Sequence, residues 1–399
     1  MEINQERLKS NLIKIGEIGK NEKGGITRLA FSSEYYQAAA ELKTLMEQAG
    51  LEVTQDELGT VFGKREGEDN SLPSLMIGSH LDTVRNGGLL DGTLGVMAAL
   101  ECINVLNEKG IKTRFPLEIA AFNAEEGSEM GGTFCSRVMV GMQDPADETL
   151  PDKLKEYDLT VADVEDAVRD IEEIRAFLEL HIEQGEVLEH EQLPIGIVNG
   201  IAGITRYRIT VKGEANHAGT TPMNLRNDAL TTAAKLITDI EEIANTFADP
   251  FVATVGKLNV HPGSVNVIPG KVEFVLELRD LDQDKIDLSL EKFEEAGHKY
   301  DNADITFEEM INKPPVDTDE SITDIIEKAC LESDIKYRHM ASGAGHDAKE
   351  IARKIPTGMI FVPSKNGKSH CPEEWTDWED IYQGVEVMLN TILLMDQNL

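Results

Sequence analysis

The stretch SHLDTVRNGGLLDGTLG, residues 79–95, decides how the fold is interpreted. It follows a short apolar run at residues 75–78, LMIG, which is typical of a strand that is buried on both faces. His80, Asp82 and Asp91 come directly after that run, and a helical pattern begins among glycines at residue 92. The sequence therefore predicts a strand, a polar loop and a helix, with charged side chains gathered where the strand ends.

The same alternation continues on both sides of this stretch. Strands are predicted at residues 51–54, 60–64, 75–79, 117–123, 176–181 and 358–362. Helices are predicted at residues 32–49, 92–110 and near the C-terminus, and residues 144–174 are acidic with a helical pattern. Strands that alternate with helices predict an α/β domain with a mostly parallel sheet and helices on both faces.

The pattern changes near residue 203. Residues 205–213, 251–263, 270–280 and 303–310 read as strands, and residues 227–247 and 284–301 read as helices. This β-α-β-β-α-β order is that of a ferredoxin-like α+β unit. We therefore predict one large domain, residues 1–203 and 314–399, that is interrupted by a small inserted domain, residues 204–313.

Composition excludes several classes of partner. The net charge of −35 over 399 residues argues against nucleic acid, whose phosphates require a basic surface. The sequence contains no run of 18 apolar residues, so no membrane span is expected. The start, MEINQERLKSNL, lacks the apolar core of a signal peptide, so we expect a cytoplasmic protein. Cys102, Cys135, Cys330 and Cys371 lie far apart, which suits reduced thiols.

Four predicted strands are followed by side chains that can bind a metal: His80, the pair Glu125 and Glu126, His181, and His370. A lone His-x-Asp or Glu-Glu pair after a strand is more often structural. The carboxyl ends of parallel strands, however, meet at one edge of a sheet, so all these groups can converge. Together with Asp91 they suit zinc or a similar divalent ion such as manganese or cobalt.

These residues also carry a resemblance to a known family. HLDTV, Asp91 after Gly-Gly, Glu125-Glu126 and His370 resemble the dinuclear-metal aminoacylase and carboxypeptidase superfamily. The strings LHIEQG, NHAGTTPM, VNVIPG, LRD, SGAGHDA and SHCPEEW resemble its ureido-cleaving branch, which contains allantoate amidohydrolases and N-carbamoyl-L-amino acid hydrolases. The resemblance covers nearly the whole chain. Its peptidase branch usually has a carboxylate at the position of His181, so histidine there favours ureido cleavage.

The resemblance implies two divalent ions per subunit, zinc or manganese, with cobalt or nickel as further options. One ion would be held by His80, Asp91 and His181, and the other by Asp91, Glu126 and His370. Asp91 would bridge the ions and screen their repulsion. Asp82 would accept a hydrogen bond from the imidazole of His80. Glu125 would be the general base, which takes a proton from water and hands it to the leaving nitrogen.

The resemblance also implies how substrate is bound. His217 would cross the interface of a homodimer to stabilise the oxyanion, which makes the insertion a lid and dimerisation domain. Asn266 and Arg279 would hold the substrate, whose carboxylate Arg279 would grip. Gln184 and the loop residues Gly343 and Ala344 would line the same pocket, with His346 nearby but not a ligand. The alternatives are a surface-loop histidine for His217, against which the NHAGTTPM string favours the functional role, and a surface ion pair for Arg279.

The expected reaction is hydrolysis of a ureido C–N bond in a small anionic substrate, with release of ammonia and CO2. Arg206 matches the arginine that allantoate amidohydrolases use for the distal ureido arm, which favours allantoate. Strand alternation puts Arg206 and Arg208 on one face, so either could be solvated. The alternative is an N-carbamoyl-L-amino acid hydrolase or a β-ureidopropionase-like enzyme. A dipeptidase, an aminoacylase or a non-catalytic binding scaffold is less favoured.

Overall fold

The computed structural model describes residues 2–300 and 302–399. The first residue of the chain and position 301, the last residue of the predicted helix 284–301, lie outside that part. The chain divides into two compact units: one runs up to Asn199 and resumes at Thr318, and the other is Gly200–Asp317. The sequence patterns placed the two divisions after residues 203 and 313.

The larger unit is built on a sheet whose central strands are parallel. The sheet order is β1 (Glu52–Gln55), β2 (Val61–Arg65), β4 (Leu117–Phe122), β3 (Ser74–His80), β5 (Ile174–Ile182), β15 (Thr357–Val362), β6 (Ile195–Ile201) and β13 (Val316–Asp317), with β14 (Tyr337–Ser342) paired to β6. The neighbours β4, β3, β5 and β15 pair in parallel, whereas β2 and β6 pair antiparallel to this centre. The predicted parallel sheet is confirmed, and antiparallel strands extend it at both edges.

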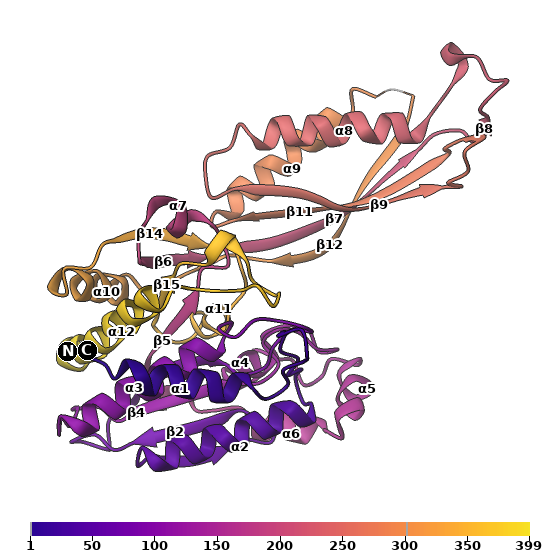
Figure 1. Ribbon diagram of the computed structural model, residues 1–399. Coiled ribbons are helices and arrows are strands. Elements are labelled where there is room, and N and C mark those ends of the chain that lie inside the picture. Colours follow the sequence, from indigo (N-terminus) through magenta and orange to yellow (C-terminus); the bar gives the residue numbers. More distant parts are fainter. Residues whose placement is uncertain (1, 301) are drawn as a thin grey trace. The chain divides into compact units, whose positions relative to one another are not determined.

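Helices cover both faces of this sheet, as predicted (Figure 1). One face, which includes Leu75, Ile119 and Leu178, packs in one core with α1 (Gln5–Gly16), α2 (Ser33–Gln48), α3 (Thr93–Glu108), α10 (Glu320–Glu332) and α12 (Trp378–Asn398). Helix α11 (Asp347–Ile351) contacts β3, β5 and β15, and also α4 (Phe134–Met139). The main-chain N–H of Ala348 in α11 donates to Glu179 of β5, whose neighbours Leu178 and Leu180 point into the first core. Helix α11 therefore lies on the opposite face.

The acidic stretch at residues 144–174 forms short helices. They are α5 (Leu150–Leu154), the 3-10 turn Lys155–Tyr157, α6 (Val161–Asp166) and the 3-10 turn Ile171–Glu173. Asp158 adopts a left-handed conformation with φ of 57°, which ends the first helical segment. Thr160 and Asp163 then form a capping box that starts α6. A further short helix, α7 (Val187–Glu191), follows β5.

The smaller unit has the predicted ferredoxin-like order. Its elements are β7 (Gly203–Lys212), α8 (Ala229–Ala244), β9 (Val252–His261), β11 (Lys271–Asp280), α9 (Gln283–Gly297) and β12 (Asp304–Lys313). The sheet order is β12-β7-β11-β9 with antiparallel neighbours, and α8 and α9 share a core with one face of it (Figure 1). A two-stranded ribbon, β8 (Asn216–His217) with β10 (Val267–Ile268), was not predicted; a 3-10 turn, Met223–Leu225, follows β8.

Two expectations about the whole chain can be compared with the structure. Among residues 2–300 and 302–399, no helix combines the length and the apolar composition that crossing a bilayer requires. Cys102, Cys135, Cys330 and Cys371 are all free, and only Cys371 is not buried, as expected for reduced thiols.

Candidate metal centre

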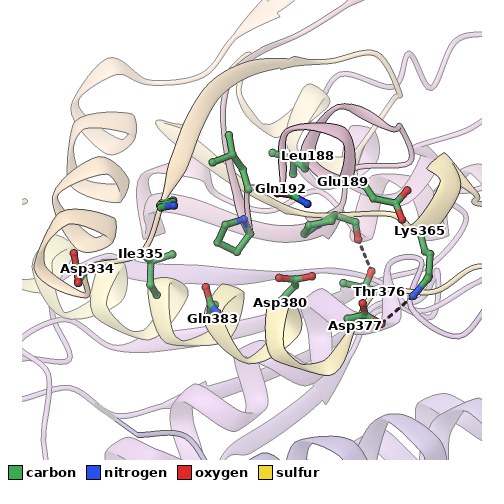
Figure 2. Close-up of a pocket in the computed structure, with 14 residues that line it drawn as sticks. Leu188, Glu189, Gln192, Asp334, Ile335, Lys365, Thr376, Asp377, Asp380 and Gln383 are labelled. Atoms are coloured by element: carbon green, nitrogen blue, oxygen red, sulfur yellow. Dashed lines mark hydrogen bonds and ion pairs between the residues drawn. The ribbon is translucent and has the colours of Figure 1, made fainter.

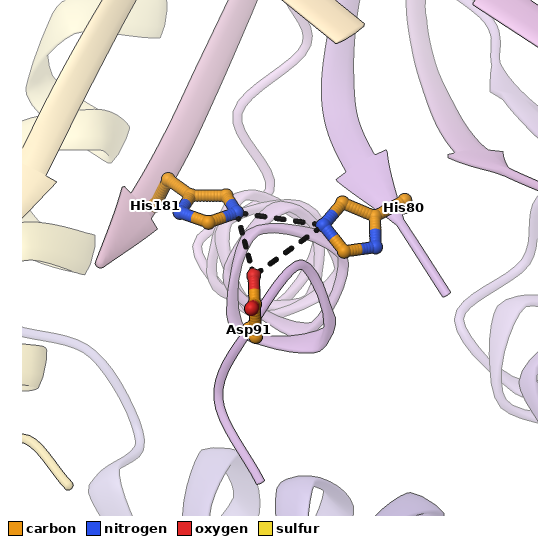
Figure 3. A group of neighbouring side chains, drawn as sticks. All are labelled: His80, Asp91 and His181. Atoms are coloured by element: carbon orange, nitrogen blue, oxygen red, sulfur yellow. Dashed lines mark hydrogen bonds and ion pairs between the residues drawn. The ribbon is translucent and has the colours of Figure 1, made fainter. Parts of the chain in front are cut away.

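The first candidate metal group gathers at the carboxyl ends of two parallel strands. His80 ends β3, His181 lies near the end of β5, and Asp91 precedes helix α3; all three are buried (Figure 3). The Nε2 atom of His181 lies 3.2 Å from Asp91 Oδ1, and that of His80 lies 3.5 Å from the same oxygen. The two Nε2 atoms are themselves 3.5 Å apart. Three ligand atoms therefore point at one place, as metal coordination requires.

The other nitrogen of each ring is fixed by the main chain. His80 Nδ1 lies 3.0 Å from the carbonyl oxygen of Asp82, and His181 Nδ1 lies 2.9 Å from that of Ile182. A carbonyl oxygen only accepts, so each Nδ1 carries the proton and donates it. Each Nε2 then has its lone pair free for a metal, and the carbonyl holds the ring in that orientation.

The second candidate group shares Asp91. Its other oxygen, Oδ2, lies 3.2 Å from His370 Nε2, which is also 3.2 Å from Glu126 Oε2. The two oxygens of Asp91 thus face different groups, Oδ1 toward His80 and His181 and Oδ2 toward His370. This arrangement is the one that a carboxylate needs to bridge two ions.

Unpartnered buried oxygens show that this donor set fits a cation. Asp91 Oδ1 and Glu126 Oε1 are buried and have no hydrogen-bond partner. Burial alone would raise the pKa of Asp91, but the adjacent imidazoles of His181, His370 and His80 outweigh it and hold that pKa well below its usual range. An acceptor that is buried, ionised and unpartnered is costly unless a positive charge meets it.

Glu125 stands beside the first group without belonging to it. Its Oε2 lies 3.8 Å from His80 Nε2, and its side chain is 9% exposed. Burial raises the pKa of Glu125 well above its usual range; nearby His80 lowers it, while Glu126 and Asp347 raise it further. A carboxylate whose pKa is raised is a stronger proton acceptor than an ordinary one, which suits a general base.

Asp82 differs from its predicted contact. Its Oδ1 lies 3.8 Å from His80 Nδ1, too far for a hydrogen bond, because the ring meets the Asp82 carbonyl instead. The carboxylate accepts the main-chain N–H groups of Glu125 and Glu126, both at 3.1 Å. The preceding residue, Ala124, has φ of 55°, a strained turn that these two hydrogen bonds hold. Asp82 therefore fixes the turn that presents the two glutamates.

His346 lies next to His181 and, with His181 and Glu179, forms a further group of side chains that could hold a metal, so its assignment as a non-ligand stays a prediction. Its ring centroid is 4.5 Å from that of His181, and its Nε2 lies 2.9 Å from Ser342 Oγ. Burial and the neighbouring His181 lower the pKa of His346 well below its usual range, so the ring is neutral. The preceding loop residues Gly343 and Ala344 are exposed and half-buried, respectively.

Gln184 contacts the bridging carboxylate directly. Its Nε2 donates to Asp91 Oδ2 at 3.2 Å, and its buried Oε1 has no partner. Its backbone has φ of 59°, and that of His370 has φ of 58°. Left-handed conformations at non-glycine residues are costly and cluster at functional sites.

The predicted substrate residues of the smaller unit form two pairs. His217 and Asn266 meet on the β8–β10 ribbon, where Ala218 N donates to the Asn266 carbonyl at 3.0 Å and both residues are exposed. Arg206 and Arg279 share Glu277: Arg206 Nε lies 2.6 Å from one carboxylate oxygen and Arg279 Nε 2.8 Å from the other. Arg208 pairs with Glu308 at 2.9 Å, and Tyr207 is buried on the opposite face.

Two buried carboxylates were missed by the sequence reasoning. Glu179 accepts from Ser79 Oγ at 2.7 Å and from Ala348 N at 2.9 Å, and so ties β3, β5 and α11 together. Glu374 accepts from the main chain of the loop that carries Asp91. Glu374 lies four residues after His370 in SHCPEEW, and proximity to a ligand was the only signal for it in the sequence.

Comparison with known proteins identifies the family of the chain. The profile of the Peptidase family M20/M25/M40 matches residues 76–394. N-carbamoyl-L-amino acid amidohydrolase of Geobacillus stearothermophilus is 40% identical over 99% of each chain. Allantoate amidohydrolase of Escherichia coli K12 is 35% identical over 96% of each chain. An amidase of the hydantoinase/carbamoylase family from Burkholderia multivorans has a similar structure, with a TM-score of 0.90 and 33% identity over 98% of each chain.

The chain therefore belongs to the Peptidase family M20/M25/M40. Within that family it falls among the ureido-cleaving amidohydrolases, which are hydrolases that act on C–N bonds other than peptide bonds. The resemblance inferred from HLDTV and the later motifs is confirmed.

Proposed function

We propose that this protein hydrolyses a ureido C–N bond of a small substrate that carries a carboxylate, using two divalent ions per subunit. The observation that carries the proposal is Asp91, whose Oδ1 faces His80 and His181 while its Oδ2 faces His370. A single-ion site or a binding scaffold has no need of this divided geometry.

The two groups named above would hold the ions, the first at His80, Asp91 and His181 and the second at Asp91, Glu126 and His370. Nitrogen and carboxylate donors suit zinc or manganese, and cobalt or nickel would also be accepted. Such ions supply Lewis acidity toward a carbonyl oxygen and toward water.

Glu125 would move the proton. It is not needed as a ligand, it is buried beside His80, and its pKa is raised. The carboxylate would accept a proton as water attacks the ureido carbon and give it to the leaving nitrogen, which departs as ammonia or an amine. Asp82 would keep Glu125 in place through the N–H groups of the 125–126 turn.

Residues of the smaller unit would bind the substrate. Arg279, prepositioned by Glu277, would take the substrate carboxylate, and Asn266 would add a hydrogen bond. His217 would stabilise the oxyanion from the partner subunit of a homodimer. Residues 204–313 would then act as a lid and dimerisation domain, and Gln184, Gly343 and Ala344 would line the pocket on residues 1–203 and 314–399.

Two substrates are favoured by different observations. Arg206 lies beside Arg279 on the same sheet face, which favours the second ureido arm of allantoate. The relatives that are 39–40% identical are N-carbamoyl-L-amino acid amidohydrolases, whereas the allantoate amidohydrolases are 35% identical, which favours an N-carbamoyl-L-amino acid. Glu277 engages Arg206 and Arg279 alike, so this contact does not separate the two substrates.

An ammonia-release assay tests the proposal. Purified protein is stripped of metal with a chelator and reloaded with Mn²⁺, Zn²⁺ or Co²⁺. It is then offered allantoate, N-carbamoyl-L-amino acids and dipeptides; cleavage of dipeptides is measured by the release of free amino groups instead of ammonia. We expect turnover of a ureido substrate only after reloading. Arg206→Leu should raise KM for allantoate but not for an N-carbamoyl amino acid, with Arg208→Leu as the matched control. Full turnover in stripped protein, or cleavage of dipeptides alone, would contradict the proposal.

A further inference from the structure

Glu374 is a buried carboxylate in the loop that connects β15 to α12 and carries His370. The loop is closed at its base by two hydrogen bonds, Lys365 N to the Trp375 carbonyl at 2.8 Å and Thr376 Oγ1 to the Pro363 carbonyl at 2.6 Å. Figure 2 shows the outer side of this base, where Thr376 and Lys365 line a pocket of about 490 Å³. Glu374 is turned away from solvent and is 4% exposed.

Within residues 2–300 and 302–399, the polar contacts of the Glu374 carboxylate lead to the Asp91 and His370 loops. Oε1 accepts the main-chain N–H groups of Leu90 at 2.9 Å and of Asp91 at 3.0 Å. Oε2 lies 3.1 Å from the hydroxyl of Ser369, the residue before His370. That hydroxyl also lies 3.1 Å from Asp91 Oδ2, the oxygen that faces His370. Glu374 therefore holds the main chain of Asp91, and its Oε2 competes with Asp91 Oδ2 for the single proton of the Ser369 hydroxyl.

Gly88 makes the close approach of the Glu374 carboxylate to the Asp91 loop possible. A Cβ at position 88 would lie 2.2 Å from the carboxylate carbon and from Oε1 of Glu374. Any larger residue there would push the carboxylate off the Leu90 and Asp91 N–H groups. Two segments nearly 300 residues apart thus depend on one close contact.

We infer that Glu374 is a positioning residue that sets the spacing of Asp91 and His370, and with it the affinity of the second metal group of Asp91, Glu126 and His370. This inference rests on the two-ion site proposed above. The first group should depend on it less, because His80 and His181 are held by their own strands and by carbonyl oxygens. Loss of such supporting contacts around a metal costs about 10- to 100-fold in affinity.

The test compares metal binding by Glu374→Ala, Glu374→Gln and, as the matched control, Glu373→Ala, whose side chain is exposed on the same loop. Zn²⁺ and Mn²⁺ are titrated into chelator-stripped protein, and bound metal per chain is counted at each free concentration. We expect Glu374→Ala to keep its first ion and to bind the second at least about 10-fold more weakly.

Glu374→Gln should rescue the second ion to within about threefold of wild type. Its Oε1 still accepts from Leu90 and Asp91, and its amide can donate to Ser369. A purely structural role would instead lower the unfolding temperature without separating the two ions. Gly88→Ala and Ser369→Ala, which displace the carboxylate or remove the linking hydroxyl, should weaken the second ion selectively even if Glu374→Ala fails to fold.

Two failures can be told apart. If wild-type protein binds no ion or only one, the proposed two-ion site is wrong. If wild type binds two ions and the alanine variants at positions 88, 369 and 374 that fold bind both with unchanged affinity, the inference about Glu374 is overturned while the proposed function stands.

Discussion

Asp91 is the residue on which both candidate metal groups depend, and its neighbours explain how it is held. Gln184 and Ser369 contact Oδ2, Glu374 holds its main-chain N–H, and Oδ1 is left to face the two buried histidines. The same kind of contact separates Glu126, whose Oε2 faces His370, from Glu125, whose nearest histidine is His80.

Replacing Glu125 with glutamine tests that separation. The variant keeps the shape of the side chain but cannot accept the proton from water, so kcat should fall by roughly 10²- to 10⁴-fold. Bound metal per chain should stay at the wild-type value, because Glu125 is assigned as a base and not as a ligand. Glu126→Gln is the contrasting variant and should lose the second ion. A Glu125→Gln protein that loses metal would show that the two assignments are interchanged.

The predictability of the site from the sequence differs from residue to residue. Convergence of His80, Glu126, His181 and His370 could be predicted because parallel strands bring their carboxyl ends to one edge. The partner of His80 Nδ1 could not be predicted, because the turn of the loop decides whether this nitrogen meets the carbonyl oxygen or the carboxylate of Asp82. Glu374 was missed because a carboxylate that accepts main-chain N–H groups 284 residues away leaves no spacing pattern.

At the scale of elements, regular apolar patterns were predicted well, whereas the breaks in an acidic stretch and a ribbon of two-residue strands were not. Helix α3 and strand β5 have apolar patterns long enough to identify them, and both were predicted to within a few residues. The stretch 144–174 was predicted as helical throughout. Its acidic pattern continues across Asp158 and Thr160, where the structure ends one helical segment and starts the next. The β8–β10 ribbon was missed because each of its strands is only two residues long and is held by pairing with a distant segment.

The turn between β1 and β2 should make stability depend on pH. Asp56 Oδ1 accepts from Leu58 N and Thr60 N, and burial raises the pKa of Asp56 to about 7. The folded state therefore binds the proton more tightly than the unfolded state does, so stability falls as pH rises from about 4 to about 7. Asp56→Asn keeps the acceptor oxygen without the charge.

We expect Asp56→Asn to raise the free energy of unfolding at pH 8, by no more than about 4 kcal/mol, and by less at pH 5. Urea unfolding of chelator-treated protein at both pH values measures this difference. Glu57→Gln, an exposed neighbour, is the control for removing one negative charge from an acidic surface. An advantage of Asp56→Asn that is equal at pH 5 and pH 8 would rule out titration of Asp56 as its cause.

At the scale of the whole molecule, the chain combines two units of different construction. The ligands of both metal groups lie in the unit built on the parallel sheet, whereas His217, Asn266, Arg206 and Arg279 lie in the ferredoxin-like unit. The proposed function therefore divides chemistry and substrate recognition between two compact units. The acidic surface implied by the net charge of −35 would repel an anionic substrate, so attraction to such a substrate must be local, through the proposed metal ions or the arginines on the β7–β11 sheet face.

The proposed dimer makes a prediction that only an assembly can fulfil. His217→Ala removes the histidine of the exposed β8 ribbon, and Glu125→Gln removes the base; each variant should be inactive alone. If His217 serves the partner's site, a mixed dimer has one site with both defects and one site with neither. With random exchange of equal amounts, half of the dimers are mixed and half of their sites are intact, so activity should recover to about a quarter of wild type.

Ammonia release from the mixture measures this recovery, and differently tagged subunits that purify together verify exchange. His261→Ala, which removes another exposed histidine of the same unit, should stay active and controls for loss of a surface imidazole. If His217 instead acts within its own chain, every site keeps one defect, and a mixture that exchanges subunits will stay inactive.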